Sequence, residues 1–184
     1  MLELDTREIY GNAFTKASQE TLKRAFRRKE RPQSVNLIAI EAPSYGRGPY
    51  SLEDISYIIK AAYTGFKAAQ IMTYKTFQMN RGTHVAVKRG ETRHPHDIRT
   101  IIHTGWWGCG AFGNNRQLIL VAQLLSANWS MIDKIVFHVQ NKEHQADIER
   151  AVRIYEGFIQ IKDVGEVIRR LHAMNFQWEK PNNT

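Results

Sequence analysis

The order of apolar and polar positions alternates between short apolar runs and longer segments with helical spacing. Short runs rich in branched aliphatic residues predict strands at 34–41, 83–87, 99–103 and 134–139. Apolar residues spaced three and four apart predict helices at 18–30, 51–66, 116–127, 143–155 and 163–174. Strands that alternate with helices are typical of the α/β class, and we expect a three-layer domain with a mixed, mostly parallel sheet flanked by helices.

The most continuous apolar run, residues 34–41, predicts a central strand covered on both faces. The helix that follows begins with a capping signal, because Ser51 precedes Asp54 by three residues. Its predicted core face consists of Ile55, Ile58, Ile59 and Ala62. We expect this helix to end near Gly65.

Residues 104–115, called here the glycine loop, contain four glycines between a predicted strand and a predicted helix. Glycine allows positive φ and close approach of a ligand to main-chain N–H groups. The helix N-terminus that follows adds unpaired donors and partial positive charge, so the arrangement suits a diphosphate. The loop matches neither dinucleotide-binding nor P-loop spacing. The alternative is a tight turn whose glycines let the helix pack on the sheet.

Composition limits the class of protein. A chain of 184 residues with 42% hydrophobic content fits one domain, which we place at 1–179 with a disordered tail at 180–184. A net charge of +8 favours polyanionic partners. The single cysteine, Cys109, excludes an internal disulfide and a multi-cysteine metal site. The sequence shows neither a leader nor a membrane span, so we expect a cytoplasmic protein without membrane contact.

Two basic segments suggest other partners. The predicted helix at 18–30 carries Arg24, Arg27 and Arg28 outside its apolar stripe, which indicates a solvated face or weak, non-specific nucleic-acid contact. His94 and His96 lie in a basic turn without a nearby cysteine or carboxylate cluster. A surface loop explains them better than zinc does, and we predict neither a metal nor another cofactor.

The glycine loop, Thr-Gly-Trp-Trp-Gly-Cys-Gly-Ala-Phe-Gly-Asn, resembles the second phosphate-binding loop of poly(ADP-ribose) glycohydrolases, which reads Thr-Gly-Asn-Trp-Gly-Cys-Gly-Ala-Phe-Gly-Gly. Trp106 replaces the family's Asn, and Asn114 replaces its last Gly. The run that ends at Glu41 and the segment 62–66 also resemble the family, as do Tyr10 and Phe14 in its Tyr-x-x-x-Phe segment. The resemblance covers about 8–66 and 100–140.

This resemblance implies a macrodomain-like fold and an ADP-ribose site. In that site the loop N–H groups would hold the diphosphate, Phe112 would pack on the distal ribose, and Tyr10 would stack on adenine beside Phe137. The implied ligand-binding residues are Tyr10, Thr104, Gly105, Trp106, Trp107, Gly108, Cys109, Gly110, Ala111, Phe112, Gly113, Asn114 and Phe137.

In the family a glycine-rich loop followed by Gln-Glu-Glu carries catalysis, and this sequence contains neither Gly-Gly-Gly nor Glu-Glu. We therefore expect the ligand-binding half without the catalytic half. The predicted function is binding of ADP-ribose or an ADP-ribose-derived nucleotide without catalysis, by a protein that recognises ADP-ribosylated partners or sequesters the nucleotide. The ligand-binding residues named above form the predicted site, and we assign no catalytic residue.

Three alternatives stay open from sequence alone. A divergent glycohydrolase could use a relocated acid among Glu3, Asp5, Glu8 and Glu41, or another chain could supply the catalytic segment. Cys109 could act as a nucleophile with a lowered pKa, although packing is the preferred role. A basic nucleic-acid-binding protein on an emptied macrodomain scaffold is the last alternative.

Overall fold

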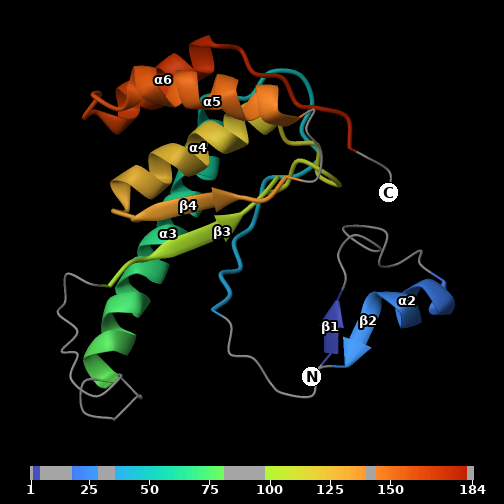
Figure 1. The fold of residues 1–184 in the computed structure, drawn as a ribbon. Coiled ribbons are helices and arrows are strands. Elements are labelled where there is room, and N and C mark those ends of the chain that lie inside the picture. Colours follow the sequence, from blue (N-terminus) through green and yellow to red (C-terminus); the bar gives the residue numbers. More distant parts are fainter. Residues whose placement is uncertain (1, 5–17, 29–35, 81–97, 140–143, 182–184) are drawn as a thin grey trace.

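A computed structural model describes residues 2–4, 18–28, 36–80, 98–139 and 144–181. The elements, in chain order, are β1 (Leu2–Leu4), α2 (Gln19–Ala25), β2 (Phe26–Arg28), α3 (Leu52–Asn80), β3 (Ile101–Thr104), α4 (Arg116–Trp129), β4 (Lys134–Phe137), α5 (Gln145–Phe158) and α6 (Val164–Ala173). Figure 1 shows α4 between the β3–β4 sheet and the pair α5 and α6.

Strands β3 and β4 form a parallel pair that leads into the glycine loop. Ile101 lies opposite Lys134, and Thr104 lies opposite Phe137. Helices α3 and α4 pack on one face of this pair, because Ile102 clusters with Phe66 of α3 and with Ala127 of α4. On the opposite face of β3, the side chain of Ile101 is 47% exposed. The carboxyl ends of both strands therefore point to the same edge as the loop.

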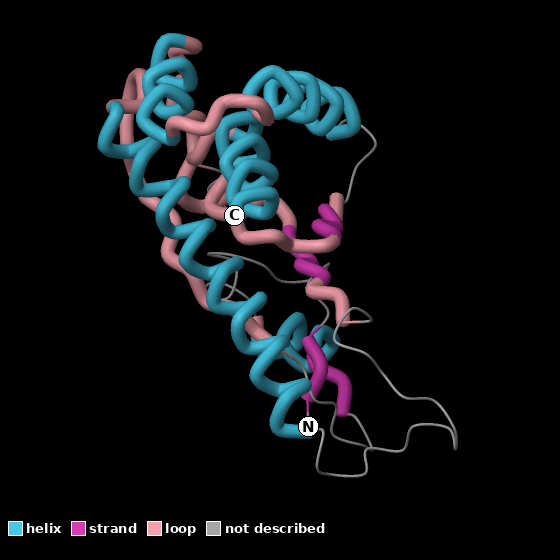
Figure 2. Tube along the Cα trace, turned by 90° about the vertical axis from the view of Figure 1, so that its left-hand side faces the viewer, coloured by secondary structure: helices cyan, strands magenta, loops and turns pink. Residues whose placement is uncertain are grey.

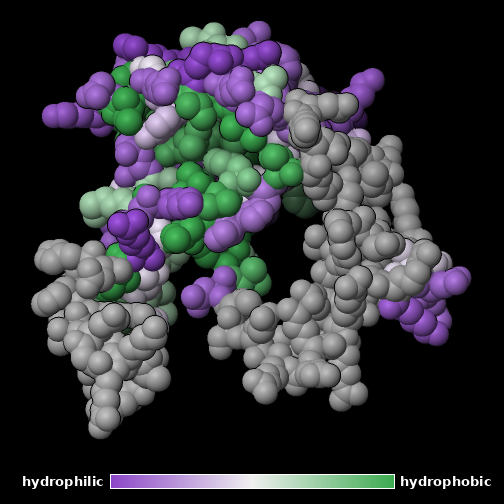
Figure 3. Space-filling view, in the orientation of Figure 1, coloured by the Kyte–Doolittle hydropathy of each residue, from purple (hydrophilic) through white to green (hydrophobic). Residues whose placement is uncertain are grey.

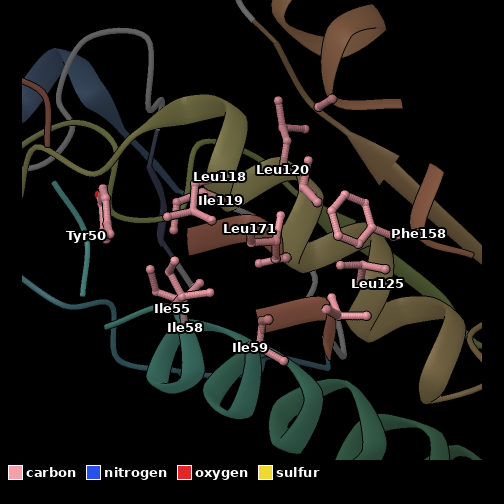
Figure 4. Packing of buried hydrophobic residues seen from close by; sticks show 14 of the residues in the cluster. Tyr50, Ile55, Ile58, Ile59, Leu118, Ile119, Leu120, Leu125, Phe158 and Leu171 are labelled. Carbon is pink, nitrogen blue, oxygen red and sulfur yellow. The ribbon is translucent and has the colours of Figure 1, made fainter. Parts of the chain in front are cut away.

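The main core lies between α3, α4, α5 and α6. Figure 4 shows Ile55, Ile58 and Ile59 of α3 facing Leu118 and the other apolar side chains of α4, with Leu171 and Phe158 beside them. Leu118, Ile119, Leu120, Val121 and Leu125 are almost completely buried. The helix that follows the glycine loop is thus fixed on several sides, and it holds the end of the loop in place.

Helices α5 and α6 cover this core with amphipathic faces. Val167 and Leu171 of α6 are buried, whereas Glu166 pairs with Arg169 and Arg170 on the surface. Figure 3 shows hydrophilic residues over these two helices and hydrophobic residues gathered near β3, β4 and α4. No helix in the described part of the chain is long and apolar enough to cross a membrane.

The predicted start of α3 is confirmed, and its predicted end is wrong. Ser51 Oγ accepts from the Asp54 N–H at 3.0 Å, and Asp54 Oδ2 accepts from the Ser51 N–H at 2.9 Å. The four predicted core residues of this helix are buried. The helix passes through Gly65 and continues to Asn80 as one long helix (Figure 2). Glycine at position 65 leaves room for the Ile40 side chain, because a Cβ there would collide with it.

The strand predicted at 34–41 is also wrong for its described part. Residues 36–41 are irregular, and Leu37 is 88% exposed. The described sheets are the pairs β1–β2 and β3–β4, and this apolar run joins neither of them. The side chains of Ile38 and Ile40 instead lie against Gly65 of α3. Strand propensity depends on such context, because a strand forms only with a partner.

At the N-terminus the helix predicted at 18–30 ends early. Helix α2 stops at Ala25, and β2 pairs antiparallel with β1, with Leu4 opposite Phe26. Pairing with β1 therefore replaces the last helical turn. Several predicted features lie outside the described residues: Tyr10, Phe14, the strand at 83–87, His94 and His96.

Candidate functional site

The glycine loop begins where β3 ends, and buried side chains fix its first residues. Thr104 Oγ1 donates to Gln123 Oε1 at 2.6 Å, and Gln123 Nε2 donates to the Gly105 carbonyl at 3.3 Å. Trp107 Nε1 donates to the Ile40 carbonyl at 3.2 Å. The loop is therefore tied to α4 on one side and to the chain before α3 on the other.

The side chain of Asn114 anchors the glycine loop through hydrogen bonds. Its side chain is completely buried, and Nδ2 donates to the carbonyls of Pro43 at 2.7 Å and Gly108 at 3.0 Å. Its Oδ1 accepts from the Tyr50 hydroxyl at 3.1 Å. The same hydroxyl accepts from the Asn115 N–H at 2.8 Å. This network holds the loop in one conformation. The side-chain oxygen and nitrogen of Asn114 are both hydrogen-bonded within the chain.

The first turn of α4 has its N–H groups paired within the chain. Asn115 Oδ1 caps the helix by accepting from Gln117 N–H and Leu118 N–H, each at 3.1 Å. Glu179 Oε1 accepts from the Arg116 N–H at 3.1 Å, and the Ile119 N–H donates to the Asn115 carbonyl. The expectation that this helix end offers unpaired donors is therefore wrong. A side-chain carboxylate already lies at the positive end of the helix dipole.

The turn before that helix offers main-chain donors instead. Gly108 and Gly113 have φ of +72° and +70°, a region that favours glycine, and they bracket the turn. Among the residues that the structure describes, none accepts from the N–H groups of Gly110, Ala111 and Phe112. Successive N–H groups in such a turn form a concave anion-binding surface. The glycine loop can therefore hold an anion at 110–112.

An aromatic pair borders this turn. Phe112 is 36% exposed, and its ring meets Tyr45 edge-on at 5.8 Å between centroids. Tyr45 has a φ of +61°, and its N–H donates to the Phe112 carbonyl at 3.3 Å. Tyr45 is not among the ligand-binding residues that the sequence predicted. Its position among the prolines and glycines of 43–49 was the available signal.

With this geometry in place, the family can be assigned. A family model of poly(ADP-ribose) glycohydrolase (PARG), macro domain fold, matches residues 4–147. The chain belongs to this family. The match confirms the predicted family and the α/β, macrodomain-like fold class. It includes the segment 67–99, where the sequence resemblance was weak. No curated protein matches the chain.

Trp106, which departs from the PARG loop pattern, is packed against neighbouring helices. Its ring meets His144 edge-on at 5.1 Å, and the Arg116 guanidinium lies 5.6 Å from its centroid. Trp106 Nε1 and Arg116 Nε are buried without a hydrogen-bond partner among the described residues. The indole thus fills the space beside the first residue of α4.

Cys109 is positioned for packing rather than for nucleophilic attack. It is buried, and its Sγ contacts the Trp107 carbonyl at 3.6 Å. Burial raises the pKa of the Cys109 thiol, the charge of Glu179 adds to this, and Arg116 opposes it. The raised pKa argues against the alternative of a nucleophile activated by the helix N-terminus, because loss of hydration outweighs the helix dipole.

Of the carboxylates considered as a relocated PARG acid, Glu41 has a described side chain. Its Oε2 accepts from the Tyr57 hydroxyl at 3.0 Å, which raises the pKa of Tyr57. Asp5 and Glu8 lie outside the described residues, as does the proposed adenine partner Tyr10. Phe137 is partly buried against the main core at the end of β4.

Histidines near the loop do not form a metal centre in the described residues. His103 Nδ1 lies 2.8 Å from His138 Nε2, so the two rings share one hydrogen bond. No group of three or more His, Cys, Asp or Glu side chains that could hold a metal ion occurs in the described ranges.

Proposed function

We propose that this PARG-family chain binds ADP-ribose, or an ADP-ribose-derived nucleotide, through residues 104–115 and does not cleave it. The observation that carries the proposal is the turn at 110–112, where three successive main-chain N–H groups have no acceptor among the described residues. A diphosphate presents several oxygen acceptors close together, which suits such a turn. Family membership supplies the ligand class.

The neighbouring side chains suit the rest of such a ligand. Phe112 and Tyr45 present aromatic surface next to the turn, where a ribose or a base can pack. The buried residues Cys109 and Asn114 would act on the ligand indirectly, by holding the loop in shape. On this proposal Tyr10 and Phe137 take the adenine side, as the family resemblance implies.

The absence of cleavage is proposed on chemical grounds. Cleavage of a glycosidic bond needs a positioned acid for the leaving group, and such help contributes about 10²–10⁴-fold. The sequence contains no Glu-Glu pair, and the carboxylate of Glu41 is hydrogen-bonded to Tyr57. Main-chain donors that bind a diphosphate hold ground state and transition state alike, so they do not accelerate the chemical step.

Calorimetric titration with ADP-ribose tests the binding proposal. Gly110→Val is expected to abolish binding, because it places a branched side chain beside the donors at 110–112. Gly157→Val is the matched control, since Gly157 lies in α5 and a Cβ there meets nothing within 4 Å. Equal affinity of folded Gly110→Val and the unchanged chain would remove the loop from the site.

A parallel product assay tests the absence of cleavage. The purified chain is expected to release no ADP-ribose from poly(ADP-ribose) or from mono-ADP-ribosylated protein. Release that disappears in Glu41→Gln would identify a relocated acid and make the chain an enzyme. Release that survives removal of each of Glu3, Asp5, Glu8 and Glu41 in turn would place the catalytic acid elsewhere.

A further inference from the structure

The C-terminal segment 176–181, called here the strap, lies across the glycine loop and the chain before α3. The Tyr50 N–H donates to the Phe176 carbonyl at 3.1 Å, and the Trp178 N–H donates to the Gly48 carbonyl at 2.9 Å. The Trp178 ring stacks on Tyr50, with centroids 4.4 Å apart and planes 12° apart. The strap is thus held beside Tyr50, which itself supports Asn114.

Further contacts attach the strap to the glycine loop directly. The Glu179 N–H donates to the Gly113 carbonyl at 2.8 Å, and Asn115 Nδ2 donates to the Gln177 carbonyl at 3.1 Å. A Cβ at Gly113 would collide with the Glu179 carbonyl, and one at Gly46 would collide with the Trp178 ring. Close approach of the strap therefore accounts for glycine at both positions.

The strap also brings a negative charge to the N-terminus of α4, where the helix dipole stabilises an anion. Glu179 Oε1 accepts the Arg116 N–H, the first donor of α4. The carboxylate lines a cavity whose other charged side chains are Arg116, Arg150 and Asp147. The N-terminus of a helix stabilises a carboxylate for the same reason that it stabilises a phosphate. Glu179 thus places a fixed negative charge at the start of the helix that follows the glycine loop.

We propose that the strap is an autoinhibitory contact in which Glu179 competes with the anionic ligand of the glycine loop. This inference rests on the proposed function, because it concerns the same site. On this proposal a diphosphate on the N–H groups of 110–112 lies close enough to feel the charge of Glu179, because those residues directly precede Gly113, whose carbonyl accepts from the Glu179 N–H. Ligand binding and strap docking then oppose each other, and each weakens the other by the same factor. The docked fraction of the strap lowers the apparent affinity.

Glu179→Gln tests the competition without removing the hydrogen bond, because an amide oxygen still accepts from the Arg116 N–H. Titration with ADP-ribose is expected to show about three- to tenfold tighter binding than the unchanged chain, since the competing charge is gone. Glu156→Gln, an exposed position on α5, makes the same change in net charge and is expected to leave affinity unchanged. Equal or weaker binding by Glu179→Gln would overturn the proposal.

Hydrogen exchange on the unchanged chain gives an independent result. Saturating ADP-ribose is expected to speed exchange of the Trp178 and Glu179 amides, which donate to Gly48 and Gly113 in the docked strap. Slower or unchanged exchange there would overturn the proposal. If the unchanged chain binds and Glu179→Gln binds no tighter, the strap proposal alone fails. If neither protein binds ADP-ribose, the proposed function fails and the strap proposal with it.

Discussion

At the residue scale, Asn114 determines the shape of the glycine loop. It is a completely buried amide whose three hydrogen bonds join the loop to Pro43, to Gly108 and to the Tyr50 hydroxyl. Buried polar groups are stable only when they are paired, so each partner depends on this one side chain. The sequence marked Asn114 as a departure from the PARG pattern but did not predict its partners Tyr50 and Pro43, because these lie more than sixty residues away.

Asn114→Ala is expected to lower the free energy of unfolding by about 3 kcal/mol, because it leaves buried groups without partners. Urea denaturation measures the change. Asn128→Ala is the control, since Asn128 is exposed on α4, and its effect is expected within about 0.5 kcal/mol. A loss of similar size in both variants would mean that the network around Asn114 contributes little.

The buried Cys109 thiol and Tyr50 hydroxyl lower the folding stability of the protein at alkaline pH. Burial raises the pKa of the Cys109 thiol above its ordinary 9.0, and burial raises that of the Tyr50 hydroxyl above its ordinary 10.0. Above pH 9 the unfolded chain therefore releases the thiol proton while the folded chain retains it, and above pH 10 the same applies to the hydroxyl. Folding stability from these groups is complete below pH 9 and is lost as pH rises.

The expected loss is about 1.4 kcal/mol per pH unit for each such proton. Denaturation at pH 8 to 11 measures it. Cys109→Ser has no thiol to ionise, so its stability is expected to fall less between pH 9 and 10 than that of the unchanged chain. Parallel curves over this interval would show that the thiol ionises equally in both states.

At the element scale, local signals in the sequence were sufficient where an element depends on adjacent residues. The capping pair Ser51 and Asp54 and the strand–loop–helix order around 104–115 are such cases. These local signals failed where contacts with distant segments determine the structure. Helix α3 passes through Gly65 because that glycine accommodates Ile40, and residues 36–41 form no strand because no described segment pairs with them. The strap was missed for the same reason, since nothing near 176–181 predicts contact with Gly113.

The cap of α3 can be tested by exchange of one side chain. Ser51→Ala removes the oxygen that accepts the Asp54 N–H and is expected to destabilise the protein by about 1 kcal/mol. Ser51→Thr keeps a hydroxyl at the same position, which can also donate to Asp54 Oδ2, and is expected to retain most of the stability. Thermal unfolding followed by circular dichroism compares the two, and an equal loss would argue against the capping role.

At the scale of the whole molecule, the proposed site combines segments that are far apart in the chain. The glycine loop supplies main-chain donors, the segment before α3 supplies Tyr45, and the strap supplies Glu179. Sequence alone predicted the first of these, because glycine spacing is a local signal and the PARG loop is specific. Family membership fixes the ligand class in general terms. We propose that this three-part arrangement determines how tightly a ligand is held.

Amide chemical shifts of ¹⁵N-labelled protein during titration with ADP-ribose test the central claim most directly. The account predicts that the largest shifts occur at Gly110, Ala111 and Phe112, whose N–H groups meet the diphosphate, and that the ligand signals stay unchanged with time. Shifts concentrated at Arg24, Arg27 and Arg28, with the amides of 110–112 unaffected, would contradict it.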